Sequence, residues 1–136
     1  RVNPRTLPAH LQMKIEHQHA VALVQWWALF SRTKGIDERL LFSIPNAGGY
    51  VGGFQKNMLR VMSMKREGVR PGIPDYFLAV PKAGAGGLFI ELKAPKGATS
   101  KDQKEVLALL ESQKYGCVVA YGWDEAKTAI EEWFKP

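Results

Sequence analysis

Two short apolar runs, separated by a segment rich in turn-forming residues, constrain this chain more than any other feature. The first run covers residues 75–80, the second covers residues 88–93, and the segment between them reads Pro-Lys-Ala-Gly-Ala-Gly-Gly. Apolar runs of this length on either side of Gly and Pro residues are typical of paired β-strands. We therefore predict a β-hairpin whose loop is longer than the tight two-residue type.

Charged residues lie at one end of this predicted hairpin. Asp75 opens the first run, whereas Glu91 and Lys93 close the second. Side chains alternate between the faces of a strand, so Glu91 and Lys93 share a face while Leu92 points the other way. We expect Asp75 to lie roughly opposite Lys93 and diagonal to Glu91. Two carboxylates and an ammonium group on one face suit a divalent cation and an activated water molecule.

A simpler interpretation treats Pro74-Asp75 as a turn and the other two charged residues as solvated parts of a strand. The neighbouring residues of both strands are apolar, however. Charged groups on a covered sheet face must be paired or bound to a metal. We therefore favour a functional site.

The rest of the hydrophobic pattern predicts an α/β fold. We expect an N-terminal arm over residues 1–12, and then a single domain over residues 13–136 that starts with a largely buried helix at 13–31. The other expected elements are a strand at 40–44, a glycine-rich loop at 45–53, helices at 54–67 and 100–115, a strand at 117–121 and a helix at 124–134. The order α-β-α-β-β-α-β-α favours a mixed β-sheet flanked by helices.

Composition narrows the class of partner. The chain has 136 residues and a formal net charge of +6, from 19 Lys and Arg against 13 Asp and Glu. This charge favours polyanions such as nucleic acid. The single cysteine, Cys117, excludes an internal disulfide and fits a reducing cytoplasm. No segment reaches the ~18 consecutive apolar residues of a membrane span, so we expect an intracellular protein without a membrane partner.

Two further polar residues have competing explanations. Glu16 lies on the helical face of Leu23 and Trp27, where a carboxylate would meet a cation inside the protein. The alternative is a first-turn Glu that the helix dipole favours. Gln103 follows Ser100 by three residues, and this capping box accounts for Gln103 without any functional role.

The histidines do not suggest a joint metal site. His17 and His19 are two residues apart in the sequence. Side chains at this spacing do not share a helix face. We expect both at the surface or in helix packing.

Basic residues cluster around the hairpin in the sequence, where they would surround an acidic site with phosphate-binding charge. The alternative is an ordinary solvated surface. The glycine-rich loop could approach a phosphate backbone, but it lacks the GxxxxGK[ST] pattern, so no nucleotide cofactor is expected. The predicted nucleic-acid-binding residues are Asn46, Lys65, Arg66, Arg70, Lys96 and Lys101.

At these residues the sequence resembles the PD-(D/E)xK nuclease superfamily and, within it, the VRR-NUC family of virus-type replication-repair nucleases. The resemblance spans roughly residues 13–133, and its most specific motif is Gly-Val-Arg-Pro-Gly-Ile-Pro-Asp at 68–75. The other motifs are Glu16 with the apolar helix after it, Ile-Pro-Asn-Ala-Gly-Gly at 44–49, Ile-Glu-Leu-Lys at 90–93, Ser100 with Gln103, and Gly-Cys-Val-Val-Ala at 116–120. Cys117-Val118 stands where a plainer apolar pair would be expected, which casts no doubt on activity.

The resemblance implies a restriction-endonuclease-like core and phosphodiester cleavage that depends on Mg²⁺ or Mn²⁺. It implies that Lys93 orients or activates the attacking water and that Gln103 supports the metal ligands or positions the substrate. Carboxylate and carbonyl oxygens are the ligands that these ions prefer. The implied metal ligands are Glu16, Asp75, Glu91 and the backbone carbonyl of Leu92.

The expected function is a DNA endonuclease selective for branched structures, such as Holliday junctions or flaps, in a bacterial cell or a phage-infected host. Because one domain carries one site, cutting both strands of a symmetric junction requires two copies, and we expect a homodimer. The alternatives are an inactive nucleic-acid-binding module and a nuclease of single-stranded DNA or RNA. The complete set of Asp75, Glu91 and Lys93 argues against the first, and few identifiable stacking aromatics argue against the second.

Overall fold

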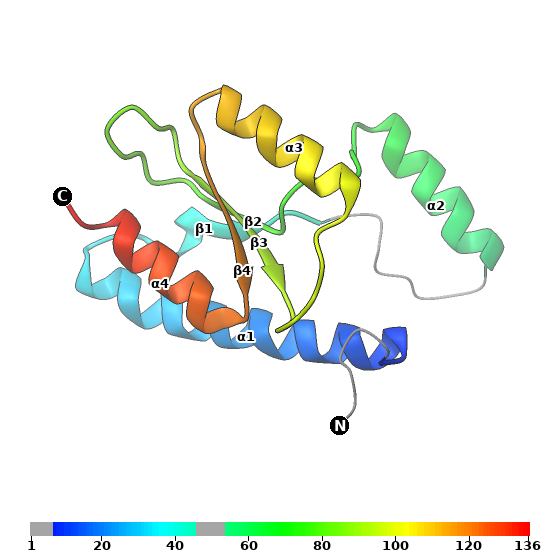
Figure 1. The fold of residues 1–136 in the computed structure, drawn as a ribbon, viewed down its shortest axis with the longest axis horizontal. Helices are drawn as coiled ribbons and strands as arrows, with labels where there is room; N and C mark the ends of the chain where they lie inside the picture. The colour runs from blue at the N-terminus through cyan, green and yellow to red at the C-terminus, as the bar shows by residue number, and fades with distance from the viewer. Residues whose placement is uncertain (1–6, 46–53) are drawn as a thin grey trace.

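The computed structural model describes residues 7–45 and 54–136, which form a four-stranded sheet between two helical layers (Figure 1). In chain order the elements are α1 (Ala9–Thr33), the 3₁₀-helix η2 (Glu38–Leu40), β1 (Leu41–Ser43), α2 (Phe54–Arg66), β2 (Tyr76–Leu78), β3 (Leu88–Lys93), α3 (Lys101–Ser112), β4 (Gly116–Tyr121) and α4 (Trp123–Trp133). The predicted α/β class and the predicted order of helices and strands are confirmed.

The sheet is mixed. Its strands lie in the order β1-β2-β3-β4, with antiparallel pairing except between β3 and β4, which are parallel. The helix α3 makes the crossover that parallel neighbours require. Backbone hydrogen bonds extend the β1–β2 ladder by one residue at each end, from the Ile44 amide to the Asp75 carbonyl (2.7 Å) and from the Ala79 amide to the Leu40 carbonyl (2.8 Å). Asp75 is therefore held in extended, paired backbone.

The hydrophobic core lies between one face of the sheet and the helices α1 and α4, whereas α3 covers the other face (Figure 1). Alternation along β3 sends Ile90 and Leu92 into this core, where they join Leu23 and Trp27 of α1 and Ile130 of α4. The same alternation sends Glu91 to the α3 side. The alternation of side chains along β3 therefore places Ile90 and Leu92 in the core and Glu91 on the opposite face of the sheet.

The helix α1 is more exposed than its composition predicts. Leu23 and Trp27 are buried, but Val21, Val24 and Leu29 are exposed, Leu29 at 67%. The prediction of a largely buried helix is wrong because α1 shares the sheet face with α4 and turns only one side toward it. No helix in the described residues is long and apolar enough to cross a membrane.

The ends of several elements differ from the predictions. The helix α1 begins at Ala9, inside the expected arm, because Pro8 accepts the first helical hydrogen bonds and needs no amide of its own. The strand β2 has only the three residues that β1 can pair with. Apart from Pro45, the predicted glycine-rich loop, with Asn46, lies outside the described residues.

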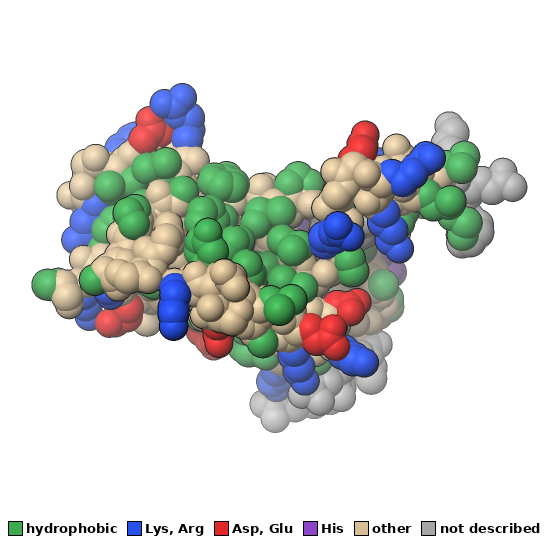
Figure 2. All heavy atoms as spheres, turned by 90° about the horizontal axis from the view of Figure 1, so that it is seen from above, with side chains coloured by type: hydrophobic (Ala, Val, Ile, Leu, Met, Phe, Trp, Pro, Cys, Tyr) green, Lys and Arg blue, Asp and Glu red, His purple; other side chains and the backbone are tan. Residues whose placement is uncertain are grey.

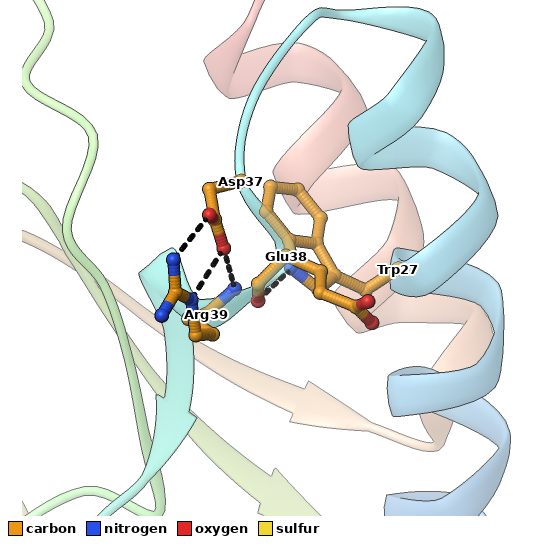
Figure 3. Close-up of polar contacts among 4 residues, drawn as sticks. All are labelled: Trp27, Asp37, Glu38 and Arg39. Carbon is orange, nitrogen blue, oxygen red and sulfur yellow. Dashed lines mark hydrogen bonds and ion pairs between the residues drawn. The ribbon is translucent and has the colours of Figure 1, made fainter.

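A small polar cluster fixes the connection from α1 to the sheet (Figure 3). The indole nitrogen of Trp27 donates a hydrogen bond of 2.8 Å to the Glu38 carbonyl. Asp37 caps η2 by accepting from the Arg39 amide and also pairs with the Arg39 guanidinium, which lowers the pKa of Asp37 to about 2. These contacts position β1 beside β2.

Candidate active site

The register of the hairpin places two carboxylates opposite each other. Tyr76 pairs with Ile90, so Asp75 is level with Glu91 and Lys93 takes the diagonal position. The prediction that Asp75 faces Lys93 is therefore wrong. All three residues nonetheless stand at the same end of the hairpin.

The hairpin loop explains this shift of register. Lys82 and Ala85 exchange backbone hydrogen bonds of 3.0 and 2.6 Å around a turn at Ala83-Gly84, where Gly84 has a φ of 80°. A loop folded symmetrically about residue 84 would pair 75 with 93. The hairpin instead turns between Ala83 and Gly84, which alone would bring 75 level with 92. Three residues separate Leu78 from Lys82 but only two separate Ala85 from Leu88, and this extra residue brings 75 level with 91.

Glu91 is buried and its two oxygens have unequal surroundings. The residue is 2% exposed. Its Oε1 accepts a hydrogen bond of 2.8 Å from the Gln103 amide and lies 3.4 Å from the Lys93 ammonium. Its Oε2 is buried and has no hydrogen-bond partner in the described part of the protein. An unpartnered carboxylate oxygen in such a place calls for a proton or a cation.

Asp75 is tied to the opposite strand through its side chain. Its Oδ2 accepts a hydrogen bond of 2.8 Å from the Leu92 amide. The structure thus shows a role for the backbone of Leu92 that the sequence did not predict, because the family resemblance concerned only the Leu92 carbonyl. The Asp75 carboxylate is fixed in direction beside Glu91.

Burial and mutual repulsion disfavour the charged forms of these carboxyls. Burial first, and then the charge of Asp75, raises the pKa of Glu91 to about 7. Burial also raises the pKa of Asp75, against the opposing effect of the Leu92 amide. Burial raises the pKa of Glu16, where Lys93 opposes the shift. Neighbouring carboxyls with raised pKa values are typical of sites that bind a proton or a metal ion.

Gln103 has two simultaneous roles. Its Oε1 accepts a hydrogen bond from the backbone amide of Ser100, while Ser100 Oγ accepts one from the backbone amide of Gln103. These two bonds confirm the predicted capping box. Its Nε2 donates to Glu91. The sequence alone explained Gln103 as a cap, because the capping pattern does not reveal what the free amide nitrogen contacts. The hydrogen bond from the Ser100 backbone amide to Gln103 Oε1 helps to hold the side-chain nitrogen against the carboxylate.

The loop that delivers Asp75 packs against the beginning of α3. Gly72 has a φ of 82°, and a Cβ there would lie 2.5 Å from the Asp102 carbonyl oxygen. Only glycine permits both the conformation and this approach. Pro74 is buried directly before Asp75. Asp75 and Gln103 therefore approach Glu91 from segments that are in contact with each other.

Glu16 joins the site from α1. With Asp75 and Leu92 it lines an open pocket of about 570 Å³ at the end of the sheet, which we call the acidic pocket. The sequence left Glu16 with two explanations. The structure excludes the explanation of a first-turn Glu, because α1 begins at Ala9 and has no acidic residue in its first turn. Glu16 instead lines the acidic pocket and also a second pocket, the latter with Lys93.

Lys93 lies beside Glu91 and lines a second pocket. Its side chain is 14% exposed. The second pocket, of about 530 Å³, lies between α1 and the loop after β3, and we call it the lysine pocket. Glu16 lines both pockets, so the two adjoin.

The predicted basic residues are placed unevenly. Lys96 lines the lysine pocket. Lys101 is exposed at the start of α3, 3.9 Å from Glu105. The exposed side chains of Lys65, Arg66 and Arg70 lie at the end of α2 and in the loop after it, and none of them lines either pocket.

His19 has a contact that sequence patterns do not reveal. Its Nδ1 accepts a hydrogen bond of 3.0 Å from the Trp123 amide, at the start of α4. Gly122, the residue at the N-cap, has no side chain to do this. The expectation of helix packing agrees with this contact. His17 lines the acidic pocket instead.

The VRR-NUC domain model matches residues 14–124, which includes every residue of this site. The chain belongs to the VRR-NUC domain family. It is also similar to a solved structure described as a VRR_NUC domain protein, with a TM-score of 0.71, 24% identity, and coverage of 88% of this chain and 87% of that chain. This likeness shows the fold. No curated protein matches the chain.

Membership in the VRR-NUC family implies a nuclease-type function, so the site can be tested for its fit to a metal ion. No group of three or more His, Cys, Asp and Glu side chains in the described residues is already arranged around one point. A half-buried Asp75 and a buried Glu91 nevertheless offer oxygen donors, Glu91 Oε2 has no hydrogen-bond partner among the described residues, and Glu16 lines the acidic pocket with Asp75. These donors fit a hard divalent cation.

Proposed function

We propose that this VRR-NUC domain is a metal-dependent endonuclease that hydrolyses phosphodiester bonds in DNA. One observation carries the proposal: Glu91 is buried level with Asp75, and its Oε2 has no hydrogen-bond partner among the residues that the structure describes. Two such carboxylates are stable together only with a proton or a cation between them. In a family of nuclease type, a cation at this place would have a catalytic use.

The proposed cofactor is Mg²⁺ or Mn²⁺. The residues that would hold it are Glu16, Asp75, Glu91 and the carbonyl of Leu92. When bound, such an ion neutralises charge on the phosphate and makes a nearby water more acidic. The Leu92 amide holds Asp75, and Gln103 holds Glu91, so both carboxylates keep their direction without the ion.

In the proposed reaction, Lys93 orients the attacking water. Its ammonium is anchored at Glu91 by one contact of 3.4 Å, and it carries further N–H donors. In the proposed reaction the water oxygen bonds to phosphorus while the bond from phosphorus to the 3′ oxygen breaks. The water loses a proton to solvent and the 3′ oxygen gains one, which leaves a 5′-phosphate and a 3′-hydroxyl.

Branched DNA, such as a Holliday junction or a flap, is the proposed substrate, and a homodimer is the proposed assembly. The net charge of +6 supports a polyanionic substrate. The site formed by Asp75 and Glu91 would cut one strand at a time, so paired cuts in a symmetric junction need two chains.

The test uses four labelled DNAs: a four-way junction, a 5′-flap, a single strand and a linear duplex, each with Mg²⁺, with Mn²⁺ or with EDTA. We expect cleavage that needs the metal and that Asp75→Asn abolishes. Asp102→Asn is the matched control, because Asp102 is an exposed carboxylate on α3.

The outcomes separate the alternatives. Junction or flap cleavage lost only in Asp75→Asn supports the proposal. Cleavage confined to single strands, or to RNA in a parallel assay, would support the proposed active site but contradict branched DNA as its substrate. Tight binding without cleavage in either metal would mean an inactive binding module.

A further inference from the structure

Lys96 adopts a backbone conformation that its side chain does not favour. Residues 94–97, Ala-Pro-Lys-Gly, form a turn closed by a hydrogen bond of 2.8 Å from the Gly97 amide to the Ala94 carbonyl, and Lys96 has a φ of 65°. A positive φ at the third position of a turn with Pro at the second normally selects Gly or Asn. Here the glycine stands one residue later, and a lysine occupies the strained position.

Gly97 is required for a different reason. A Cβ on Gly97 would lie 3.0 Å from the Ala94 carbonyl oxygen and 3.4 Å from Lys93 Cβ. The turn is therefore packed directly against the side chain of Lys93. Lys96 is consequently held at a fixed place relative to the lysine of the active site.

The lysine pocket lies beside this turn. Lys93, Lys96 and the backbone of residues 94–98 form one wall, and Gln12, Ile15 and Glu16 of α1 form the other. Because Glu16 also lines the acidic pocket, the two pockets adjoin at the active site. Glu16 and Asp75 line the acidic pocket, whereas Lys93, Lys96 and Glu16 line the lysine pocket. Because its two lysines outnumber its one carboxylate, the lysine pocket suits an anion, and the acidic pocket suits a cation.

We infer that the lysine pocket is a subsite for a phosphate that flanks the cleaved bond in the DNA strand, with Lys96 as the residue that binds it. Lys93 is engaged by Glu91, so a neighbouring phosphate needs a second cation. Lys114 has the same backbone conformation away from the site, so the assignment rests on the place of Lys96 in the lysine pocket beside Lys93. The inference rests on the proposed function and adds a substrate contact to it.

The structure supplies a matched pair of variants to test this. Lys96→Gly removes the ammonium and relieves the strained backbone at the same time. Lys114 is also a lysine with a positive φ, of 71°, but it is exposed after the C-terminal end of α3, at the opposite end of the sheet from Lys93. Lys114→Gly therefore makes the same chemical and conformational change away from the site. Both variants should keep or raise the melting temperature.

DNA binding should separate the two variants. With fluorescein-labelled 5′-flap DNA in EDTA, we expect Lys96→Gly to raise Kd about 3- to 10-fold and to reduce the slope of log Kd against log salt by about 0.7 to 0.9, as for one lost phosphate contact. Lys114→Gly should bind as the wild type does. Equal binding by both variants would overturn the subsite while leaving the proposed nuclease intact.

A neutral methylphosphonate, placed in turn on each side of the cleaved bond, tests which phosphate is bound. At one of the two positions it should weaken wild-type binding by the same factor as Lys96→Gly, and it should not weaken that variant further. Independent, additive losses at both positions would overturn the assignment. If the wild type neither binds nor cleaves any of the DNA structures, the proposed function fails and the subsite fails with it.

Discussion

Glu91 has one oxygen that accepts from Gln103 and Lys93 and one that has no partner in the described residues, and this asymmetry makes the metal-free protein sensitive to pH. Burial raises the pKa of Glu91 from 4.5 to about 7. Between these pH values the folded state holds a proton that the unfolded chain releases. The free energy of unfolding therefore falls as the pH rises toward 7 and stays reduced above it.

The substitution Glu91→Gln tests this directly. In EDTA at about pH 8 we expect the variant to be more stable than the wild type, by roughly 1–3 kcal/mol, because a neutral amide replaces a buried charge. At about pH 5 the difference should shrink, since the wild-type side chain is then protonated. Urea unfolding at the two pH values measures both effects. Equal stability of variant and wild type at the higher pH would show that the charge of Glu91 does not destabilise the folded protein.

Gln103 links the helix cap to the site, and two substitutions separate these roles. Ser100→Ala removes the cap and should cost about 1 kcal/mol of stability with little effect on cleavage. Gln103→Ala should cost about 1–2 kcal/mol and also lower kcat at least about 10-fold, because Glu91 loses a hydrogen bond that fixes its direction. Thermal melts and single-turnover cleavage rates distinguish the two. If both variants lose the same activity, Gln103 acts only through the helix.

At the scale of the elements, the sequence predicted those helices, strands and caps that depend on residues close together in the chain. The strand β3 was found at its full length, because alternating buried residues and a run of glycines define it, and the cap of α3 was found because Ser100 and Gln103 form it alone. The register of the hairpin was missed because it depends on where a long loop turns. The contact of Gln103 with Glu91 did not follow from the local pattern, and only the family resemblance implied a role for Gln103 beside the metal ligands. The contact of His19 was missed because it joins segments distant in the sequence.

The packing of the 67–74 loop against α3 gives a prediction at this scale. Gly72→Ala combines a positive φ with a Cβ placed 2.5 Å from the Asp102 carbonyl oxygen, and it should cost roughly 3 kcal/mol and displace Asp75. Gly68→Ala is the control, because Gly68 has a φ of 103° but nothing within 4 Å of the added Cβ. We expect about 1 kcal/mol for that variant, with cleavage retained. Chemical denaturation and cleavage rates measure both. Similar losses in the two variants would contradict a role for the loop–helix contact.

At the scale of the whole molecule, one face can be seen to carry dispersed basic charge. Figure 2 shows Lys and Arg side chains spread over several parts of the face seen from above, with hydrophobic side chains between them. Dispersed charge attracts a polyanion without fixing its orientation. Orientation on DNA must then come from contacts close to the site and, in the proposed assembly, from a second chain.

A homodimer that cuts both strands of a junction makes a prediction about mixed subunits. Sedimentation equilibrium should give twice the chain mass of 15.2 kDa. When wild type is allowed to exchange with an excess of Asp75→Asn, most active chains will be paired with an inactive one, so junctions should be cut once rather than twice. Wild type diluted with buffer alone is the control and should keep its paired cuts. Paired cuts that persist in the mixture, together with the mass of a single chain, would mean that each chain works alone. A flap, which needs only one cut, would then replace the symmetric junction as the proposed substrate.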